Sequence, residues 1–176
     1  MELELFSYSS NTLLTNAAFL KGNPIEFYSQ DANRNYVEKT LFGEIVKQAN
    51  KRNTKLYKIK DTTNSLTDNV CFFAISVGHI EANKQTNIPS VVIDYFIVND
   101  KYRKQTLNNG LTIAQECFRS ILSLIDQLSN QIGIRYIILQ PLNKEAKIIK
   151  FYDDFGFKFI QGRKSDWMYL DIAYIK

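Results

Sequence analysis

The sequence predicts an α/β protein: a single domain with a mixed, mostly antiparallel twisted sheet and helices on both of its faces. Three observations predict this fold. Segments of helical spacing alternate with short runs that are rich in β-branched and aromatic residues. Their order is strands, helix, strand, helix, strands, which is typical of a mixed sheet with helices packed against it. No repeat, linker or low-complexity tract divides the chain, so we expect one domain over residues 1–176.

The amino-terminal third contains the first predicted helix, which ends in the polar stretch 50–53. Its apolar residues stand at helical spacing, so one face is expected to be buried. They are Val37, Leu41, Phe42 and Ile45. Three strands are predicted after it, because the first segment alternates, the second is almost wholly apolar and the third is rich in β-branched and aromatic residues. These segments are 55–60, 70–77 and 90–98.

A long helix is the clearest element of the sequence. Apolar residues recur every three or four positions between 107 and 128 and trace one helix face. They are Leu107, Leu111, Ala114, Phe118, Ile121, Ile125 and Leu128. Gly133 closes the connection that follows it. Residues 136–139 then predict a short strand buried on both faces.

A second helix is predicted after this strand. Asn143 is suited to cap its start, and Gly156 is placed to end it in the left-handed conformation. Its apolar side includes Ala146, Ile149 and Phe155. The last two predicted strands cover 157–160 and 167–172.

The composition limits where the protein is expected to work. The longest apolar stretches, 70–77 and 91–98, are far shorter than the ~20 residues that a membrane helix needs. The first five residues carry acids where a secretory signal carries bases, and no apolar region follows them. We therefore expect a cytoplasmic protein that does not bind a membrane.

Cysteine content and charge are less specific. Cys71 and Cys117 lie in apolar contexts with no second Cys or His at metal-ligand spacing, so we expect buried free thiols and no metal site. The net charge of +4 favours anionic partners, but the basic residues are dispersed along the chain. Such a charge fits CoA, RNA or simply a solvated surface.

Two junctions between a predicted strand and the next helix form the candidate ligand site. They cover 98–110 and 140–145, and junctions of this kind hold ligands in open α/β sheets. At the first junction, Arg103 and Lys104 add positive charge at the start of a long helix, whose amide groups and dipole favour a phosphate. The alternative is an ordinary basic loop capped by Thr106.

Two motifs resemble the GNAT superfamily of N-acetyltransferases. The first consists of the apolar run 93–98, then Tyr102 and Arg103 opening a helix that contains Leu111 and Ala114. The second is more specific, because it keeps the spacing of that superfamily's Asn-x-x-Ala-x-x-x-x-Phe-Tyr-x-x-x-Gly-Phe signature. Its residues are Asn143, Ala146, Phe151, Tyr152, Gly156 and Phe157. As an order of elements, the resemblance covers roughly residues 54 to 172.

The resemblance implies a GNAT-like fold and acetyl-CoA as the cofactor. The residues that it assigns to cofactor binding are Phe96, Ile97, Val98, Arg103, Lys104, Gln105, Thr106, Leu107, Asn108, Asn143 and Phe151. The superfamily writes the loop as Gln/Arg-x-x-Gly-x-Gly/Ala. Here Thr106 and Asn108 replace the small residues, which let backbone amides approach a pyrophosphate closely.

The resemblance also implies direct attack of an amine on the acetyl thioester. Tyr152 matches the tyrosine that often protonates the departing CoA thiolate; the alternative is a core aromatic beside Phe151 and Phe155. Asp94 interrupts an apolar strand, where an unpaired carboxylate is costly, so it lies on a solvated face or is retained as the base. The other candidates for a base are His79 and Glu81.

The function predicted from these residues is acetyl transfer from acetyl-CoA to a primary amine. A catalytically degenerate GNAT-like binding or scaffold module is the alternative, because of Thr106 and Asn108. A narrower resemblance is to the acetyltransferase toxins that acetylate aminoacyl-tRNA. It makes an RNA-linked amine a candidate acceptor, beside the amines of proteins and small molecules. Its segments are 133–135, 155–157 and 168–170. The sequence leaves the acceptor and the oligomeric state open, a homodimer included.

Overall fold

The computed structural model describes residues 1–9, 19, 27–63, 68–83, 86–142, 144–160 and 166–175. Within them, the strands are β1 (Leu3–Ser7), β2 (Lys55–Asp61), β3 (Asp68–Asn83), β4 (Thr86–Val98), β5 (Tyr136–Leu139), β6 (Lys158–Phe159) and β7 (Met168–Asp171). They pair in the order β1-β2-β3-β4-β5-β7-β6. β4 and β5 run parallel, whereas the pairs β1–β2, β2–β3, β5–β7 and β6–β7 run antiparallel. The predicted mixed, mostly antiparallel sheet is therefore confirmed.

The helices of the described residues are α2 (Ala32–Asn50), α3 (Ile113–Ile132) and α4 (Ala146–Asp154), with two short 3-10 helices, η2 (Asp100–Tyr102) and η3 (Ile172–Tyr174). Helix α2 confirms the helix predicted in the amino-terminal third. Asp31 caps it by accepting a hydrogen bond from the Arg34 amide at 2.8 Å. None of the helices of the described residues is long and apolar enough to cross a membrane.

The chain divides into two compact units. The first comprises Met1–Ile75 and Tyr95–Ser120, and the second comprises Ser76–Asp94 and Ile121–Lys176. Strands β3 and β4 and helix α3 contribute residues to both units. The expectation of one domain over residues 1–176 stays a prediction.

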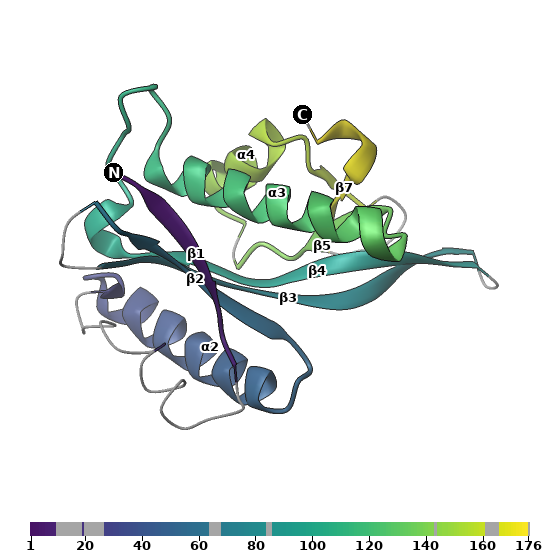
Figure 1. The fold of residues 1–176 in the computed structure, drawn as a ribbon, viewed down its shortest axis with the longest axis horizontal. Coiled ribbons are helices and arrows are strands. Elements are labelled where there is room, and N and C mark those ends of the chain that lie inside the picture. The colour runs from purple at the N-terminus through teal and green to yellow at the C-terminus, as the bar shows by residue number, and fades with distance from the viewer. Residues whose placement is uncertain are drawn as a thin grey trace. The chain divides into compact units, whose positions relative to one another are not determined.

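In the first unit, the two faces of the sheet carry different helices (Figure 1). Tyr95 and Ile97 of β4 belong to the apolar cluster that includes Phe42 of α2. Phe96, between them, faces the other way, and its ring packs against Phe118 of α3 with centroids 5.3 Å apart. Successive side chains of a strand alternate between faces, so β4 is covered from both sides, as predicted.

Aromatic side chains fill the core between the sheet and α2. Phe72 of β3 is at the centre of this cluster, with its ring 6.0 Å from Phe19, 5.2 Å from Phe27 and 4.8 Å from Phe42, measured between centroids. These rings meet in tilted or edge-on geometries, which aromatic pairs prefer over direct stacking. The packing holds α2 against the strands that lead to the candidate site.

The sequence pattern does not predict β1, and it underestimates the lengths of β3 and β4. Four of the five β1 residues are exposed, so the strand lacks the alternation that marks a half-buried strand. It forms through backbone pairing with β2, in which Leu5 lies opposite Ile59. Strands β3 and β4 extend through polar residues because backbone groups make their pairing, which does not depend on the kind of side chain.

In the second unit, β5 has the predicted bounds, and Ile137, Ile138 and Leu139 are buried. The predicted end of α4 is also confirmed. Gly156 adopts φ +88°, and the amide that follows it, of Phe157, donates to the Tyr152 carbonyl at 3.1 Å. Strands β6 and β7 lie within the two segments predicted to be the last strands.

The start of α4 differs from the prediction. Asn143 lies outside the described residues, and the residue that precedes the first turn as N-cap is Glu145, which makes no side-chain capping bond. A backbone bond from Ile149 to the Glu145 carbonyl, at 3.1 Å, begins the helix instead.

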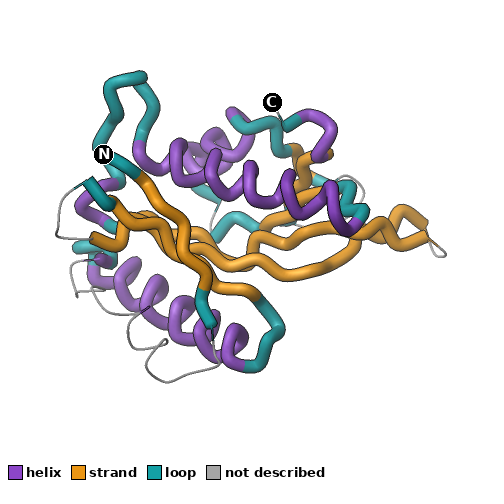
Figure 2. The backbone as a smooth tube through the Cα atoms, viewed as in Figure 1, coloured by secondary structure: helices purple, strands orange, loops and turns teal. Residues whose placement is uncertain are grey.

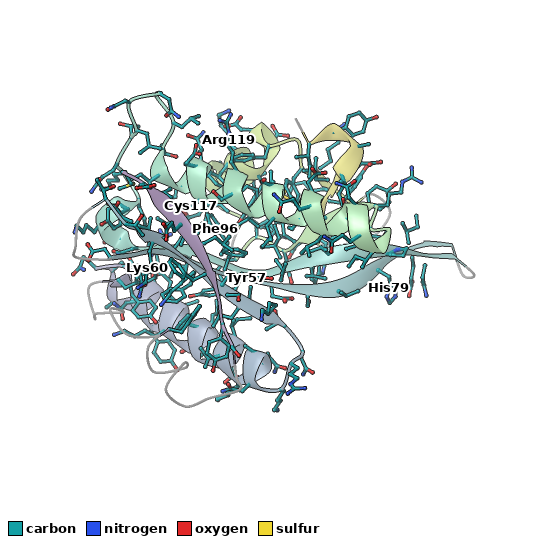
Figure 3. The ribbon with its side chains drawn as sticks, viewed as in Figure 1. Tyr57, Lys60, His79, Phe96, Cys117 and Arg119 are labelled. Carbon is teal, nitrogen blue, oxygen red and sulfur yellow. The ribbon has the colours of Figure 1, made fainter. Side chains whose placement is uncertain are left out.

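Both cysteines are buried free thiols, as predicted, and both belong to the first unit. In Figure 3 the labelled Cys117 lies near Phe96, between the strands and α3. Burial, together with the neighbouring Cys117, raises the pKa of the Cys71 thiol. The described residues contain no group of three or more His, Cys, Asp or Glu side chains that could hold a metal ion.

Candidate functional site

Residues 105–113, which follow η2 and lead into α3, form a small hairpin. Thr106 and Thr112 lie opposite each other in an isolated antiparallel bridge. The bonds on either side of this bridge run from the Leu107 amide to the Leu111 carbonyl at 2.7 Å and from the Ile113 amide to the Gln105 carbonyl at 3.0 Å. The hairpin is the teal loop that rises from the strands at the upper left of Figure 2.

This hairpin corrects the prediction that a helix begins at Leu107. Helix α3 begins six positions later, at Ile113. Leu107 and Leu111 have helical spacing, but the sequence between them, Asn-Asn-Gly, favours a tight turn. Gly110 adopts φ +81° there, in the left-handed region where glycine carries no steric cost.

Thr112, not Thr106, caps the start of α3. Its hydroxyl accepts a hydrogen bond from the Gln115 amide at 3.2 Å, and the Gln115 side-chain oxygen accepts one from the Thr112 amide at 2.9 Å. Such a reciprocal pair is a capping box. It occupies amides at the helix end that was expected to face a phosphate.

Several amides of the hairpin donate to acceptors inside the hairpin. Besides those of the bridge and of the capping box, the Gly110 amide donates to the Leu107 carbonyl at 3.0 Å and the Leu111 amide donates to the Asn109 side chain at 3.1 Å. A glycine-rich phosphate loop instead points such amides at its ligand. These bonded amides can therefore contact an anion only if the anion replaces their present acceptors.

Arg103 points its guanidinium into the protein. Its Nε donates to the Val98 carbonyl at 2.8 Å, and its Nη2 donates to Glu38 Oε2 at 2.9 Å. Its Nη1 lies 3.3 Å from Asp100 Oδ1, an ion pair without hydrogen-bond geometry. The Arg103 side chain is only 16% exposed, whereas the next cation, Lys104, is exposed.

Glu38 of α2 is the partner that sequence reasoning misses. Its carboxylate is buried and also accepts from the Ser29 amide and from Arg34 Nε, each at 2.9 Å. Burial alone would raise the pKa of Glu38, but the bonds from Arg103, Ser29 and Arg34 outweigh it and hold the pKa below its usual value. The only local signal is the i,i+4 spacing of Arg34 and Glu38, which is common on exposed helices.

A second group of polar contacts fixes η2 against β3. Asp68 accepts from Lys101 Nζ at 2.7 Å and from the Tyr102 hydroxyl at 3.0 Å, and these bonds lower the pKa of Asp68. Asn99 caps η2 by accepting from the Lys101 amide at 3.0 Å. The chain therefore leaves β4 in one defined direction.

The carboxyl end of β4 extends past its partner strand. Pairing with β5 ends at Ile93 and Leu139, whereas β4 continues to Val98. Of the predicted cofactor residues in this stretch, Ile97 and Val98 are buried and Phe96 is half-buried. Ile97 belongs to the core on the α2 side, so its backbone is the part left to contact a ligand.

The predicted catalytic residues, Asp94 and Tyr152, both belong to the second unit. Asp94 lies on a solvated face, where Ser76 Oγ donates to its carboxylate at 3.0 Å. The Tyr152 ring lies in α4 beside Phe151, with centroids 5.3 Å apart, and burial raises the pKa of its hydroxyl to about 12. His79 and Glu81 are exposed on β3.

No family model and no curated protein sequence matches the chain. Solved structures of the toxins AtaT and KacT do match it over nearly its whole length. A tyrosine-to-phenylalanine mutant of KacT has a TM-score of 0.71 at 13% identity, covering 99% of this chain and 98% of the other.

AtaT has been solved with several ligands. AtaT mutated from tyrosine to phenylalanine, bound to acetyl-CoA and to the C-terminus of the antitoxin AtaR, has a TM-score of 0.69 at 14% identity, covering 98% of this chain and 95% of the other. AtaT complexed with acetyl-methionyl-tRNAfMet has a TM-score of 0.70 at 14% identity, covering 99% and 97%. At these identities the likeness establishes the fold, and the α/β fold class predicted from the sequence is confirmed.

Proposed function

We propose that this protein is an acetyl-CoA-dependent N-acetyltransferase that transfers the acetyl group to a primary amine. The observation that carries the proposal is the match, over the whole chain, to a toxin that was solved with acetyl-CoA. The Phe151-Tyr152 pair supports it, because it lies on α4 at the position that the superfamily signature gives it.

The proposed reaction needs one proton acceptor and one proton donor. The amine nitrogen attacks the carbonyl carbon of the thioester, a C–N bond forms, and the C–S bond breaks to release CoA as a thiolate. Tyr152 donates the proton that this thiolate takes up, since a thiol of pKa about 8.5 leaves more readily with an acid beside it. Asp94 is the proposed acceptor of the proton that the amine loses.

The residues proposed to bind the cofactor come from the end of β4, from the hairpin and from the signature around α4. Backbone groups of Phe96, Ile97 and Val98 are assigned to the pantetheine arm, and the exposed Lys104 is assigned to the pyrophosphate. The further residues proposed to line the site are Arg103, Gln105, Thr106, Leu107, Asn108, Asn143 and Phe151. Because the amides of Leu107, Gly110 and Leu111 are bonded within the hairpin, these three reach a phosphate only if part of the hairpin opens.

The proposed acceptor is the amine of an aminoacyl-tRNA. Two facts support it: AtaT was solved with acetyl-methionyl-tRNAfMet, and this chain has a net charge of +4, which suits a polyanion. An acceptor of this kind implies a cytoplasmic protein. If the acceptor is RNA, its binding weakens steeply with added salt, because binding releases counterions.

Calorimetry with acetyl-CoA tests the proposal first. A ligand that binds only the folded protein releases or absorbs heat and raises the unfolding temperature. No heat and no thermal shift with millimolar cofactor would remove the basis of the enzyme proposal. Acetylation of charged tRNA and of spermidine, each at low and high salt, then identifies the acceptor; turnover of spermidine without RNA binding would reject the RNA acceptor.

A second candidate function is a GNAT-like binding module without catalysis. The observation that favours it is the hairpin, in which several amides already have partners. Replacing Thr106 and Asn108 with glycine separates the two functions. A gain in acetyl-CoA affinity from nothing detectable identifies a degenerate site, whereas unchanged or reduced affinity shows that the native hairpin binds in its own way.

A further inference from the structure

Glu38 joins three segments of the first unit through one carboxylate. Oε1 accepts from Arg34 Nε, and Oε2 accepts from both the Ser29 amide and Arg103 Nη2, each bond being 2.9 Å long. The carboxylate is 5% exposed, so its charge is removed from water and depends on these donors. Removing Arg103 leaves a buried charge that the remaining donors compensate only in part.

Arg103 passes this constraint on to the end of β4. Its Nε holds the Val98 carbonyl while its Nη2 holds Glu38, so two nitrogens of one rigid, planar group are both occupied. A lysine has one point charge on a flexible stem and cannot make both contacts with the same geometry. The last carbonyl of β4 is therefore located relative to α2 through a single side chain.

A second contact joins the same two elements. The Tyr95 hydroxyl donates to the backbone carbonyl of Glu38 at 3.3 Å. Tyr95 and Val98 both lie in the β4 segment that extends past β5, and both are attached to Glu38, one directly and one through Arg103. This segment contains the backbone proposed to contact the thioester arm.

The geometry argues against Arg103 as a phosphate ligand. Its three nitrogens are directed at Val98, Glu38 and Asp100, and 84% of the side chain is removed from solvent, given its exposed fraction of 16%. Lys104, the adjacent cation, is exposed and forms no ion pair among the described residues. The charge that meets a pyrophosphate is thus on Lys104.

We infer that Glu38 and Arg103 are positioning residues, which hold the carboxyl end of β4 and the start of the cofactor loop in the arrangement that acetyl transfer needs. The inference rests on the proposed function and deepens it, because it assigns Arg103 to the scaffold and not to the pyrophosphate. A positioning residue affects any acyl donor, whereas a phosphate ligand affects only a donor that has the phosphates.

Two acyl donors separate these roles: acetyl-CoA and S-acetylpantetheine, which has the same thioester arm without the nucleotide and its phosphates. We expect Arg103→Lys and Glu38→Gln to lower kcat/KM by about 10²-fold with both donors, the loss that a small misplacement of reacting groups can cause. We expect Lys104→Gln to raise KM for acetyl-CoA alone. Glu44→Gln, an exposed glutamate of α2 paired with Lys47, is the matched control and leaves both donors unchanged.

The double variant Glu38→Gln/Arg103→Lys tests whether the two residues act as a unit. Its loss is expected to equal that of either single variant, because residues of one network are not additive. Arg103→Lys with normal turnover, or a loss confined to acetyl-CoA, would overturn the inference. If Glu38→Gln does not fold by circular dichroism, Arg103→Lys with the two donors decides alone. A wild-type protein inactive with both donors instead overturns the proposed function, and the inference with it.

Discussion

The ring of Tyr152 packs edge-on against the fully buried ring of Phe157, with their centroids 6.0 Å apart. The left-handed turn at Gly156 brings Phe157 back toward the last turn of α4, where Tyr152 lies. This contact is made by the ring, which phenylalanine retains. Replacing Tyr152 with phenylalanine should therefore keep the contact with Phe157.

The first prediction is that Tyr152→Phe slows acetyl transfer by about 10²–10⁴-fold without lowering acetyl-CoA affinity, because it removes only the proposed acid. Steady-state kinetics and calorimetry measure the two effects separately. Tyr169→Phe, on strand β7, is the control, since the Tyr169 ring also packs edge-on against another ring, that of Tyr136. A Tyr152→Phe rate within about twofold of wild type returns Tyr152 to a packing role.

The pH dependence provides a second readout for the same residue. Burial raises the pKa of Tyr152 to about 12, so the phenol stays protonated where an ordinary tyrosine, of pKa about 10, is half ionised. The ratio of wild-type to Tyr152→Phe rates should therefore stay constant from about pH 8 to about pH 10. A ratio of the two rates that falls toward one near pH 10 would contradict the raised pKa of Tyr152.

The second prediction concerns two glycines with open surroundings. A Cβ atom at Gly110 or at Gly43 meets no atom within 4 Å, so neither substitution by alanine creates a clash. Gly110 has φ +81°, and we expect Gly110→Ala to lower the free energy of unfolding by roughly 1–2 kcal/mol. Gly43 lies inside α2, and Gly43→Ala should raise the free energy of unfolding by about 0.5–1 kcal/mol.

Urea denaturation of the two glycine variants beside wild type measures both effects. Changes of the same sign would show that backbone conformation is not the difference between the two positions. A Gly110→Ala protein as stable as wild type would contradict the hairpin described between β4 and α3.

The third prediction concerns Glu38 at acid pH. Its pKa in the folded protein is lower than in the unfolded chain, where it is about 4.3, so its stabilising effect is fully present above that pH. The effect is lost as the pH falls through the folded value. The difference in unfolding free energy between wild type and Glu38→Gln should therefore shrink from about pH 6 to about pH 3. The exposed Glu44→Gln control should show little change, and a Glu38→Gln difference independent of pH would contradict the buried pair.

The fourth prediction concerns Lys58 at alkaline pH. Lys58 is buried in β2, where its Nζ donates to the Phe19 carbonyl and lies 4.4 Å from the centroid of the Phe19 ring. Burial, with repulsion from Lys60, lowers its pKa to about 8. The unfolded chain, with a lysine pKa of about 10.4, then binds more protons between these values, so stability rises with pH in this window.

Chemical denaturation at pH 7 and pH 10 tests this sign. The unfolding free energy of wild type should increase relative to Lys58→Met as the pH rises, because the cost of the buried charge disappears. Lys55→Met, an exposed lysine of the same strand, is the control. A wild-type protein that loses stability relative to Lys58→Met over this range would contradict the assigned environment.

Local patterns in the sequence determined the strand at 136–139, the helix in the amino-terminal third and the left-handed end of α4 at Gly156. Each depends on neighbouring residues: an apolar run, a 3.6-residue period, or a glycine where a side chain is strained. The signature around Tyr152 was recognisable for the same reason, since its residues lie close together in the sequence, within 143–157. The fold class followed from the order of these elements.

Only the tertiary structure decided the start of α3, the presence of β1 and the partner of Arg103. Leu107 and Leu111 fit a helix or a hairpin, and the bridge between Thr106 and Thr112 selects the hairpin. Arg103 and Glu38 are 65 positions apart, so no local pattern relates them. Hydrophobic periodicity reports which face of a segment is buried, whereas the partner of a buried charge depends on what the folded chain places beside it.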